Sequence, residues 1–179
     1  VCSSDLITNT FEIPNSSDKI ILPGVGSFAN AMNTIIEKQI NIFLNDILED
    51  NNKALLGICL GMQLLSNSSD EDGFNNGLGY INAQVSKFID NNLKIPHVGF
   101  NQIDINKNSK LFKYLPDNPD FYFTHSYRML SDYDINQSYC HYGDKFIAAF
   151  EYKNIYGTQF HPELSQNNGI QLLKNFIEL

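Results

Sequence analysis

The sequence predicts an α/β fold, with a mainly parallel sheet flanked by helices and antiparallel strands added to that sheet. Two observations lead to this prediction. Near the start of the chain, short apolar runs end in turns and are each followed by a segment with helical spacing. Further along, several segments alternate apolar and polar residues or are rich in β-branched and aromatic residues, as antiparallel strands are.

Two strand-to-helix units follow one another in the first third of the chain. Lys19-Ile20-Ile21-Leu22 predicts a strand, Pro23-Gly24-Val25-Gly26 a turn, and the apolar spacing from Ser27 to Glu49 one helix. Ala54-Leu55-Leu56-Gly57-Ile58 predicts the next strand, and a helix begins in Leu60 to Leu65. Two such units in succession indicate a parallel sheet covered on both faces.

The second half of the chain predicts short strands and one closing helix. The predicted strands are residues 84–88, 101–105, 121–124, 146–151 and 155–160. Asn168 to Leu179 has the apolar spacing of a helix, with Leu172 and Phe176 on its apolar face.

Length and charge limit the functions that this chain can have. It has 179 residues, 42% of them hydrophobic, which predicts one domain over residues 1–179. The formal charge of −8 disfavours nucleic acid and anionic membranes as partners. No apolar run approaches the roughly 20 residues of a membrane span, and no secretory leader is visible, so we expect a cytoplasmic protein.

The three cysteines, Cys2, Cys59 and Cys140, have no CxxC spacing and fit neither a disulfide framework nor a zinc site. We therefore expect no metal and one reactive thiol. Residues 1–6, Val-Cys-Ser-Ser-Asp-Leu, match the translation of a common sequencing-adapter string, so we expect them to be non-native; the alternative is a natural polar loop.

Cys59 is the candidate nucleophile. It lies in Gly57-Ile58-Cys59-Leu60-Gly61, between a predicted strand and a predicted helix. Glycines on both sides permit a sharp turn that raises the side chain above the sheet, as in the G-x-S-x-G elbow. A helix N-terminus or a nearby histidine lowers the pKa of a thiol and makes it a better nucleophile. Taken alone, the motif fits a buried, inert core cysteine equally well.

Phe160-His161-Pro162-Glu163 can supply the base and the group that orients it. On an extended segment His161 and Glu163 point to the same side, so that the carboxylate can fix the imidazole tautomer. The alternative is a surface turn with two exposed side chains. The other histidines are expected to be structural, with His97 in a loop and His141 in a polar turn.

An oxyanion hole can form from two backbone N–H groups. The amide of Leu60 follows the candidate nucleophile at the start of a helix. The amide of Val25, between Gly24 and Gly26, is the second candidate, because its glycine neighbours let the peptide take either orientation. On its own, this turn is as well explained by a tight loop.

Taken together, five ordered motifs resemble class I (triad) glutamine amidotransferases, and within them the HisH glutaminase subunits of imidazole glycerol phosphate synthase. The motifs are residues 22–28 (LPGVGSF), 57–65 (GICLGMQLL), 96–101 (PHVGFN), 125–127 (HSY) and 157–163 (GTQFHPE). The resemblance runs from about Asp18 to the C-terminus, and it favours the nucleophile interpretation of Cys59.

The resemblance implies a class I glutamine amidotransferase-like (flavodoxin-like) fold and a Cys59, His161, Glu163 triad that hydrolyses L-glutamine through a γ-glutamyl thioester. It implies no cofactor, and it implies a heterodimer in which ammonia passes to a HisF-like (β/α)8-barrel cyclase for histidine biosynthesis. Gln63 and Glu71 resemble glutamine-binding residues, with Gly24 and Gly26 nearby. The alternatives are an exposed helix glutamine and one charge of the solvated Asp70-Glu71-Asp72 run.

Three departures from the family pattern leave other functions open. The family begins with a strand and helix, roughly 30 residues for such a unit, which we expect a truncated frame to have removed. Leu164 stands where the family commonly has lysine, and Phe100 where it usually has tryptophan. The alternatives are another cysteine hydrolase on this fold, a paralogue that feeds ammonia to another synthase, such as one that aminates a sugar nucleotide, and a non-catalytic regulatory subunit.

Overall fold

The computed structural model describes residues 19–50, 52–89 and 92–179. Residues 1–6, for which we expect a non-native origin, lie outside the described part. The helices are α1 (Phe28–Glu37), α2 (Ile40–Glu49), α3 (Leu60–Leu64), α4 (Gln166–Ile177) and the 3-10 helix η1 (Pro162–Leu164). The strands are β1 (Lys19–Leu22), β2 (Ala54–Ile58), β3 (Ser68–Ser69), β4 (Asn75–Asn76), β5 (Gln84–Lys87), β6 (His97–Asp104), β7 (Asp120–His125), β8 (Tyr127–Leu130), β9 (Ser138–Tyr142), β10 (Asp144–Tyr152) and β11 (Ile155–Thr158).

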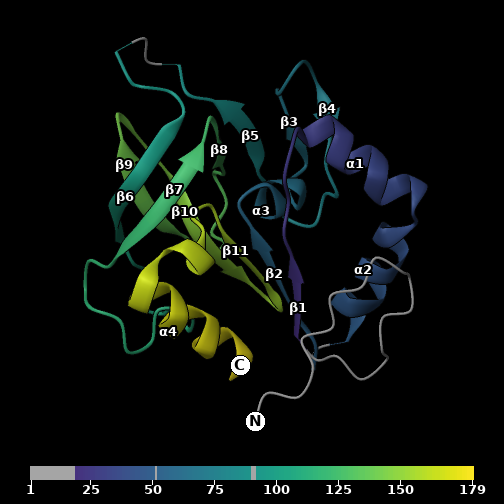
Figure 1. Cartoon of the computed structure of the whole chain (residues 1–179). Helices are drawn as coiled ribbons and strands as arrows, with labels where there is room; N and C mark the ends of the chain where they lie inside the picture. Colours follow the sequence, from purple (N-terminus) through teal and green to yellow (C-terminus); the bar gives the residue numbers. More distant parts are fainter. Residues whose placement is uncertain (1–18, 51, 90–91) are drawn as a thin grey trace.

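The main sheet has the order β1-β2-β11-β10-β9-β6-β7, and it confirms the predicted α/β class (Figure 1). β1, β2 and β11 are parallel, whereas the pairs from β11 to β7 are antiparallel. The antiparallel share is therefore larger than predicted. A second sheet, β4-β3-β5-β8, carries the loop after α3.

Helices cover both faces of the parallel strands, as predicted. On one face Leu56 of β2 belongs to a core cluster with Leu172 and Phe176 of α4. On the other face Leu55 belongs to a cluster with Leu44 and Ile47 of α2. Figure 1 shows the same arrangement, with α4 on one side of β1 and β2 and with α1 and α2 on the other.

The predicted single helix from Ser27 to Glu49 is wrong, because two helices occupy this segment. Gln39 has a φ of 58° and ends the first helix, and its backbone N–H donates to the Ile36 carbonyl. The turn lets each helix bury its own stripe. Ile36 and Ile42, on either side of the turn, are 55% and 54% exposed, although both fit the apolar spacing of a single helix.

Two histidines were assigned to the wrong element. His97 begins β6 and is buried, where a loop was expected. His141 lies in β9, where its Nε2 is 3.2 Å from Asp104 Oδ2. The Pro96 and Gly143 neighbours predicted turns, but aromatic packing and strand pairing extend the strands through these positions. Among the described helices, none combines the length and apolar character that crossing a membrane requires.

Candidate active site

Cys59 lies at the sharp turn that the sequence predicted, between the end of β2 and the start of α3. Its φ of 52° and ψ of −110° are a strained conformation for a residue with a side chain. A Cβ on Gly61 would stand 1.8 Å from the Leu22 carbonyl oxygen, and one on Gly57 would stand 2.7 Å from the Met62 nitrogen. The flanking glycines therefore allow β1, β2 and α3 to meet at this turn.

The predicted oxyanion elements lie beside the turn. A Cβ on Gly24 would be 2.8 Å from the Leu60 Cβ, so the loop after β1 presses against the first residue of α3. Val25, next along that loop, is 93% exposed. The backbone N–H of Leu60 lowers the pKa of the Cys59 thiol, as a donor close to the sulfur does.

His161 and Glu163 form the predicted pair, with His161 Nδ1 2.7 Å from Glu163 Oε1. The pairing does not come from an extended segment, because Pro162–Leu164 is a turn of 3-10 helix. The His161 backbone is held on both sides. Its N–H donates to the Tyr122 carbonyl at 2.9 Å, and its carbonyl accepts from the Ser165 hydroxyl at 2.6 Å.

The surroundings of Cys59 favour the protonated form of its thiol. Burial raises the pKa of the thiol to about 11, and the negative charge of Glu163 raises it further, while Leu60 and Gln159 oppose this. The thiol Sγ donates to the Thr124 carbonyl, 4.0 Å away. Within the described residues, the buried Nε2 of His161 has no hydrogen-bond partner. The expected lowering of the thiol pKa is therefore wrong for this state.

Gln63 and Glu71 have protein partners in this structure. Gln63 is buried, and its Nε2 donates to the Tyr127 carbonyl at 3.1 Å and to Gln159 Oε1 at 2.9 Å. Glu71 Oε2 accepts from the Phe28 N–H at 2.9 Å, at the start of α1. Neither side chain is the merely solvated group that the sequence allowed, and glutamine binding stays a prediction for both.

Sequence reasoning missed Gln159. This residue is fully buried, and its Nε2 lies 3.7 Å from Cys59 Sγ. It also missed the contact between His97 Nδ1 and His125 Nε2, which are 3.1 Å apart under aromatic cover. The signal for Gln159 was its position two residues before His161 in the fifth motif, whereas no spacing connects His97 with His125.

The remaining candidate groups lie apart from this chemistry. Cys140 is fully buried in β9, and burial raises the pKa of its thiol to about 12, so it is suited to packing. In the ranges 19–50, 52–89 and 92–179, no group of three or more His, Cys, Asp or Glu residues could hold a metal ion.

Comparison with known proteins agrees with this geometry. The chain matches the family "Glutamine amidotransferase class-I" over residues 2–179. It is 43% identical to the imidazole glycerol phosphate synthase subunit HisH of Leptospira borgpetersenii, over 97% of this chain and 87% of that one. It is also 43% identical to HisH 1 of Campylobacter jejuni (strain RM1221), over 91% of this chain and 82% of that one.

A solved structure supports the fold. A glutamine amidotransferase from Thermotoga maritima superimposes with a TM-score of 0.64 at 20% identity, over 94% of this chain and 65% of that one. The sharp turn at Cys59, the His161–Glu163 pair and the near full-length similarity all agree: the chain belongs to the class I glutamine amidotransferases, among the HisH subunits of imidazole glycerol phosphate synthase.

Proposed function

We propose that this chain is the glutaminase subunit of an imidazole glycerol phosphate synthase and acts in histidine biosynthesis. It hydrolyses L-glutamine to glutamate and ammonia, with Cys59 as the nucleophile. The observation that carries the proposal is the convergence of a strained cysteine turn with a histidine whose Nδ1 is bound by a carboxylate. The HisH relatives, named as subunits of that synthase, support the pathway.

In the proposed reaction His161 is the general base and Glu163 orients it. Because Glu163 accepts from Nδ1–H, the other ring nitrogen, Nε2, is left unprotonated and able to take the thiol proton. The thiolate attacks the side-chain amide carbon of glutamine. The C–N bond then breaks, and the imidazolium returns its proton to the leaving nitrogen, which departs as ammonia. Water hydrolyses the γ-glutamyl thioester to glutamate.

The oxyanion of each tetrahedral intermediate would be held by the Leu60 and Val25 amides. Leu60 supports this role through its position at the start of α3, and Val25 through the packing of its loop on Leu60. Gly24 and Gly26 leave room for substrate at this loop. Glu71 would bind glutamine after exchanging the Phe28 N–H for it, and Gln63 would bind it through its side-chain oxygen, which leaves both hydrogen bonds of its NH2 group in place.

The ammonia would pass to a HisF-like (β/α)8-barrel cyclase in a heterodimer, in the cytoplasm. Exposed apolar side chains near the triad support a docking face there. Phe100 is 46% exposed and packs edge-on against Tyr122, whose carbonyl accepts from the His161 N–H. Leu164, beside Glu163, is 52% exposed. A cyclase docked at this face would therefore contact residues that adjoin His161, the proposed base.

The test is glutamate release by the chain alone and with its cyclase. The raised thiol pKa and the unpaired Nε2 predict slow release by the chain alone and at least tenfold faster release in the complex. Cys59→Ala should abolish release, and Cys140→Ala should leave it unchanged. Equal rates with and without the cyclase, or an active Cys59→Ala variant, would reject the proposal. Stimulation by another synthase alone would assign the ammonia to a different pathway.

A further inference from the structure

A continuous set of hydrogen bonds runs from the sulfur of Cys59 into the antiparallel part of the sheet. Gln159 Nε2 lies 3.7 Å from Cys59 Sγ, and Gln159 Oε1 accepts from Gln63 Nε2 at 2.9 Å. Gln63 Nε2 also donates to the Tyr127 carbonyl at 3.1 Å. His125 Nδ1 reaches the same carbonyl at 2.7 Å. We call Gln159 and Gln63 the glutamine pair.

The backbone carbonyl of Tyr127 fixes which way the glutamine pair points. A carbonyl oxygen only accepts, so the atom of Gln63 that faces it must be the NH2 nitrogen. The second N–H of that nitrogen then meets an acceptor on Gln159, which has to be Oε1. The Gln159 NH2 group is thereby turned toward the sulfur. The donor at Cys59 is thus dictated by a main-chain atom of β8.

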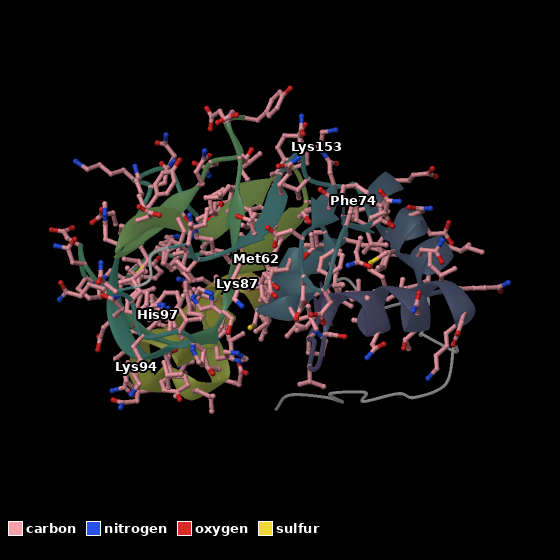
Figure 2. The ribbon with its side chains drawn as sticks, turned by 90° about the horizontal axis from the view of Figure 1, so that it is seen from above. Met62, Phe74, Lys87, Lys94, His97 and Lys153 are labelled. Carbon is pink, nitrogen blue, oxygen red and sulfur yellow. The ribbon has the colours of Figure 1, made fainter. Side chains whose placement is uncertain are left out.

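Burial makes this orientation durable. Gln159 is fully buried and Gln63 is 5% exposed, so flipping either amide would leave buried polar atoms without partners. In Figure 2 the label of Met62, the neighbour of Gln63, stands near the middle of the molecule, and that of His97 stands on the side away from α1 and α2. The hydrogen bonds lead from Gln63 to His97 through Tyr127 of β8 and His125 of β7.

Of the ionisable groups near the sulfur, Glu163 disfavours the thiolate, and His161 favours it only after it has taken the thiol proton. Glu163 acts on Cys59 through its negative charge and disfavours a second one. His161 and Glu163 come from the η1 side, and His125 comes from β7, where its ring is buried and bonded to His97. The neutral donors that reach Sγ are the Leu60 N–H and the Gln159 amide. The Leu60 N–H is also a proposed donor to the oxyanion, so the Gln159 amide is the one that serves the sulfur alone.

We propose that Gln159 is a positioning residue for the glutaminase reaction. Its amide N–H holds the Cys59 sulfur in place and stabilises the thiolate, and Gln63 sets the direction of that amide. The proposal rests on the proposed function in one respect, namely that Cys59 is the nucleophile. A charge-assisted N–H bond to a thiolate favours the charged form, so removing it makes the thiol harder to ionise.

The test is the rate at which iodoacetamide alkylates Cys59, followed by mass spectrometry so that each cysteine is read separately. Gln159→Met keeps the bulk of the side chain and removes the donor. We expect alkylation at pH 8 to slow by about three- to tenfold, since a pKa rise of about one unit lowers the thiolate fraction tenfold and raises thiolate nucleophilicity only partly in return. Gln63→Met, which does not touch the sulfur, should slow alkylation about twofold.

The matched control is Gln84→Met, at an exposed position of β5, which should alkylate at the wild-type rate. In the complex with the cyclase, Gln159→Met should lower kcat and move the acid limb of its pH profile up by about one unit, with KM changed less than twofold. A structural role would lower the melting temperature without moving that limb.

A folded Gln159→Met variant with wild-type alkylation and pH profile would overturn the proposal. If that variant does not fold, wild-type alkylation of a folded Gln63→Met variant overturns it instead. Failure of the proposed function is separate, because it shows as glutamate release that survives Cys59→Ala. Alkylation needs neither glutamine nor a partner and reports the thiol alone.

Discussion

The thiol proton of Cys59 is donated to a backbone carbonyl that has no role in the proposed reaction. The thiol donates to the Thr124 carbonyl, while the acceptor nitrogen of His161 is buried without a partner. An unsatisfied buried acceptor is unfavourable by about 1–3 kcal/mol, so a movement that joins Sγ to Nε2 is favoured by the hydrogen bond that Nε2 gains. Substrate or partner binding has only to permit this movement.

The orienting carboxylate can be tested at the same scale. Glu163→Gln replaces the acceptor at His161 Nδ1 by an amide that can present N–H instead, which favours the wrong imidazole tautomer. We expect kcat for glutamate release by the complex to fall about 10²- to 10⁴-fold, the usual contribution of general acid–base catalysis, with KM nearly unchanged. Steady-state kinetics would measure both. Glu178→Gln, at the exposed end of the chain, is the control, and a Glu163→Gln variant within about twofold of wild type would contradict the assignment.

The sequence allowed part of the site to be predicted at residue level. The turn at Cys59 and the contact between His161 and Glu163 could be predicted, because the flanking glycines and the i, i+2 spacing are visible in the chain, and the catalytic roles of these residues stay a prediction. The state of the thiol could not, because its pKa is dominated by burial, which depends on segments more than 60 residues away such as Thr124. Gln159 was hidden for the same reason: its role depends on Gln63, 96 positions earlier.

At the scale of elements, glycines govern how closely the strands and helices of the site approach. Gly61 lies under the end of β1 and Gly169 of α4 lies under Pro162, with Cβ clashes of 1.8 Å at the Leu22 and Pro162 carbonyl oxygens respectively. The first contact fixes the end of β1, from which the Gly24–Gly26 loop follows, and the second fixes η1. Close backbone contacts, which only glycine permits, therefore position the elements of the candidate site.

Gly61→Ala should separate β1 from α3. Its Cβ would overlap a backbone oxygen, which cannot rotate away, so we expect a loss of about 1–3 kcal/mol in the free energy of unfolding. In a chain of this length that is a fall in Tm of about 2–12 °C, measured by calorimetry. Asn33→Ala, on the exposed face of α1, should leave Tm nearly unchanged. If both variants had the same Tm, the close approach of Gly61 to the Leu22 carbonyl would not contribute to stability.

Elements were predicted where the local pattern decides them. β1, β2 and α3 begin or end within a residue of the prediction, because apolar runs and glycines mark their limits. The break at Gln39 was missed, since neither glycine nor proline marks it and the left-handed φ arises from packing two helices against different neighbours. His97 became a strand residue through pairing with His125, which no local pattern contains.

At the scale of the whole molecule, buried histidines connect the fold to pH. Burial lowers the pKa of His97 to about 4 and that of His125 to about 3, from an ordinary 6.5. As the pH falls below 6.5, the unfolded chain binds protons at these two histidines, whereas the folded chain does not bind them until the pH nears 4 and 3. Stability from the two histidines is thus complete above pH 6.5 and is lost as the pH falls toward 4 and then 3.

Urea unfolding at pH 7 and pH 5 should show this loss. Each histidine contributes a slope of up to about 1.4 kcal/mol per pH unit in that window. His97→Phe keeps a ring between Phe123 and Tyr142 and removes one titrating group, so its stability should fall less steeply. Asn33→Ala, on the exposed face of α1, changes no titrating group and should keep the wild-type slope. Identical slopes for all three proteins would refute the role of the buried pair.

The backbone at Cys59 has a consequence for how such a chain can change. With φ at 52° and ψ at −110°, only glycine is free of strain, and a residue with a Cβ is disfavoured by about 1–3 kcal/mol. Calorimetry should therefore find Cys59→Gly at least as stable as Cys59→Ala, the reverse of the usual order. Replacement by glycine at this position would remove the proposed nucleophile and relieve this strain at the same time. Keeping the thiol therefore requires continuous selection for activity, because selection for stability alone would remove it.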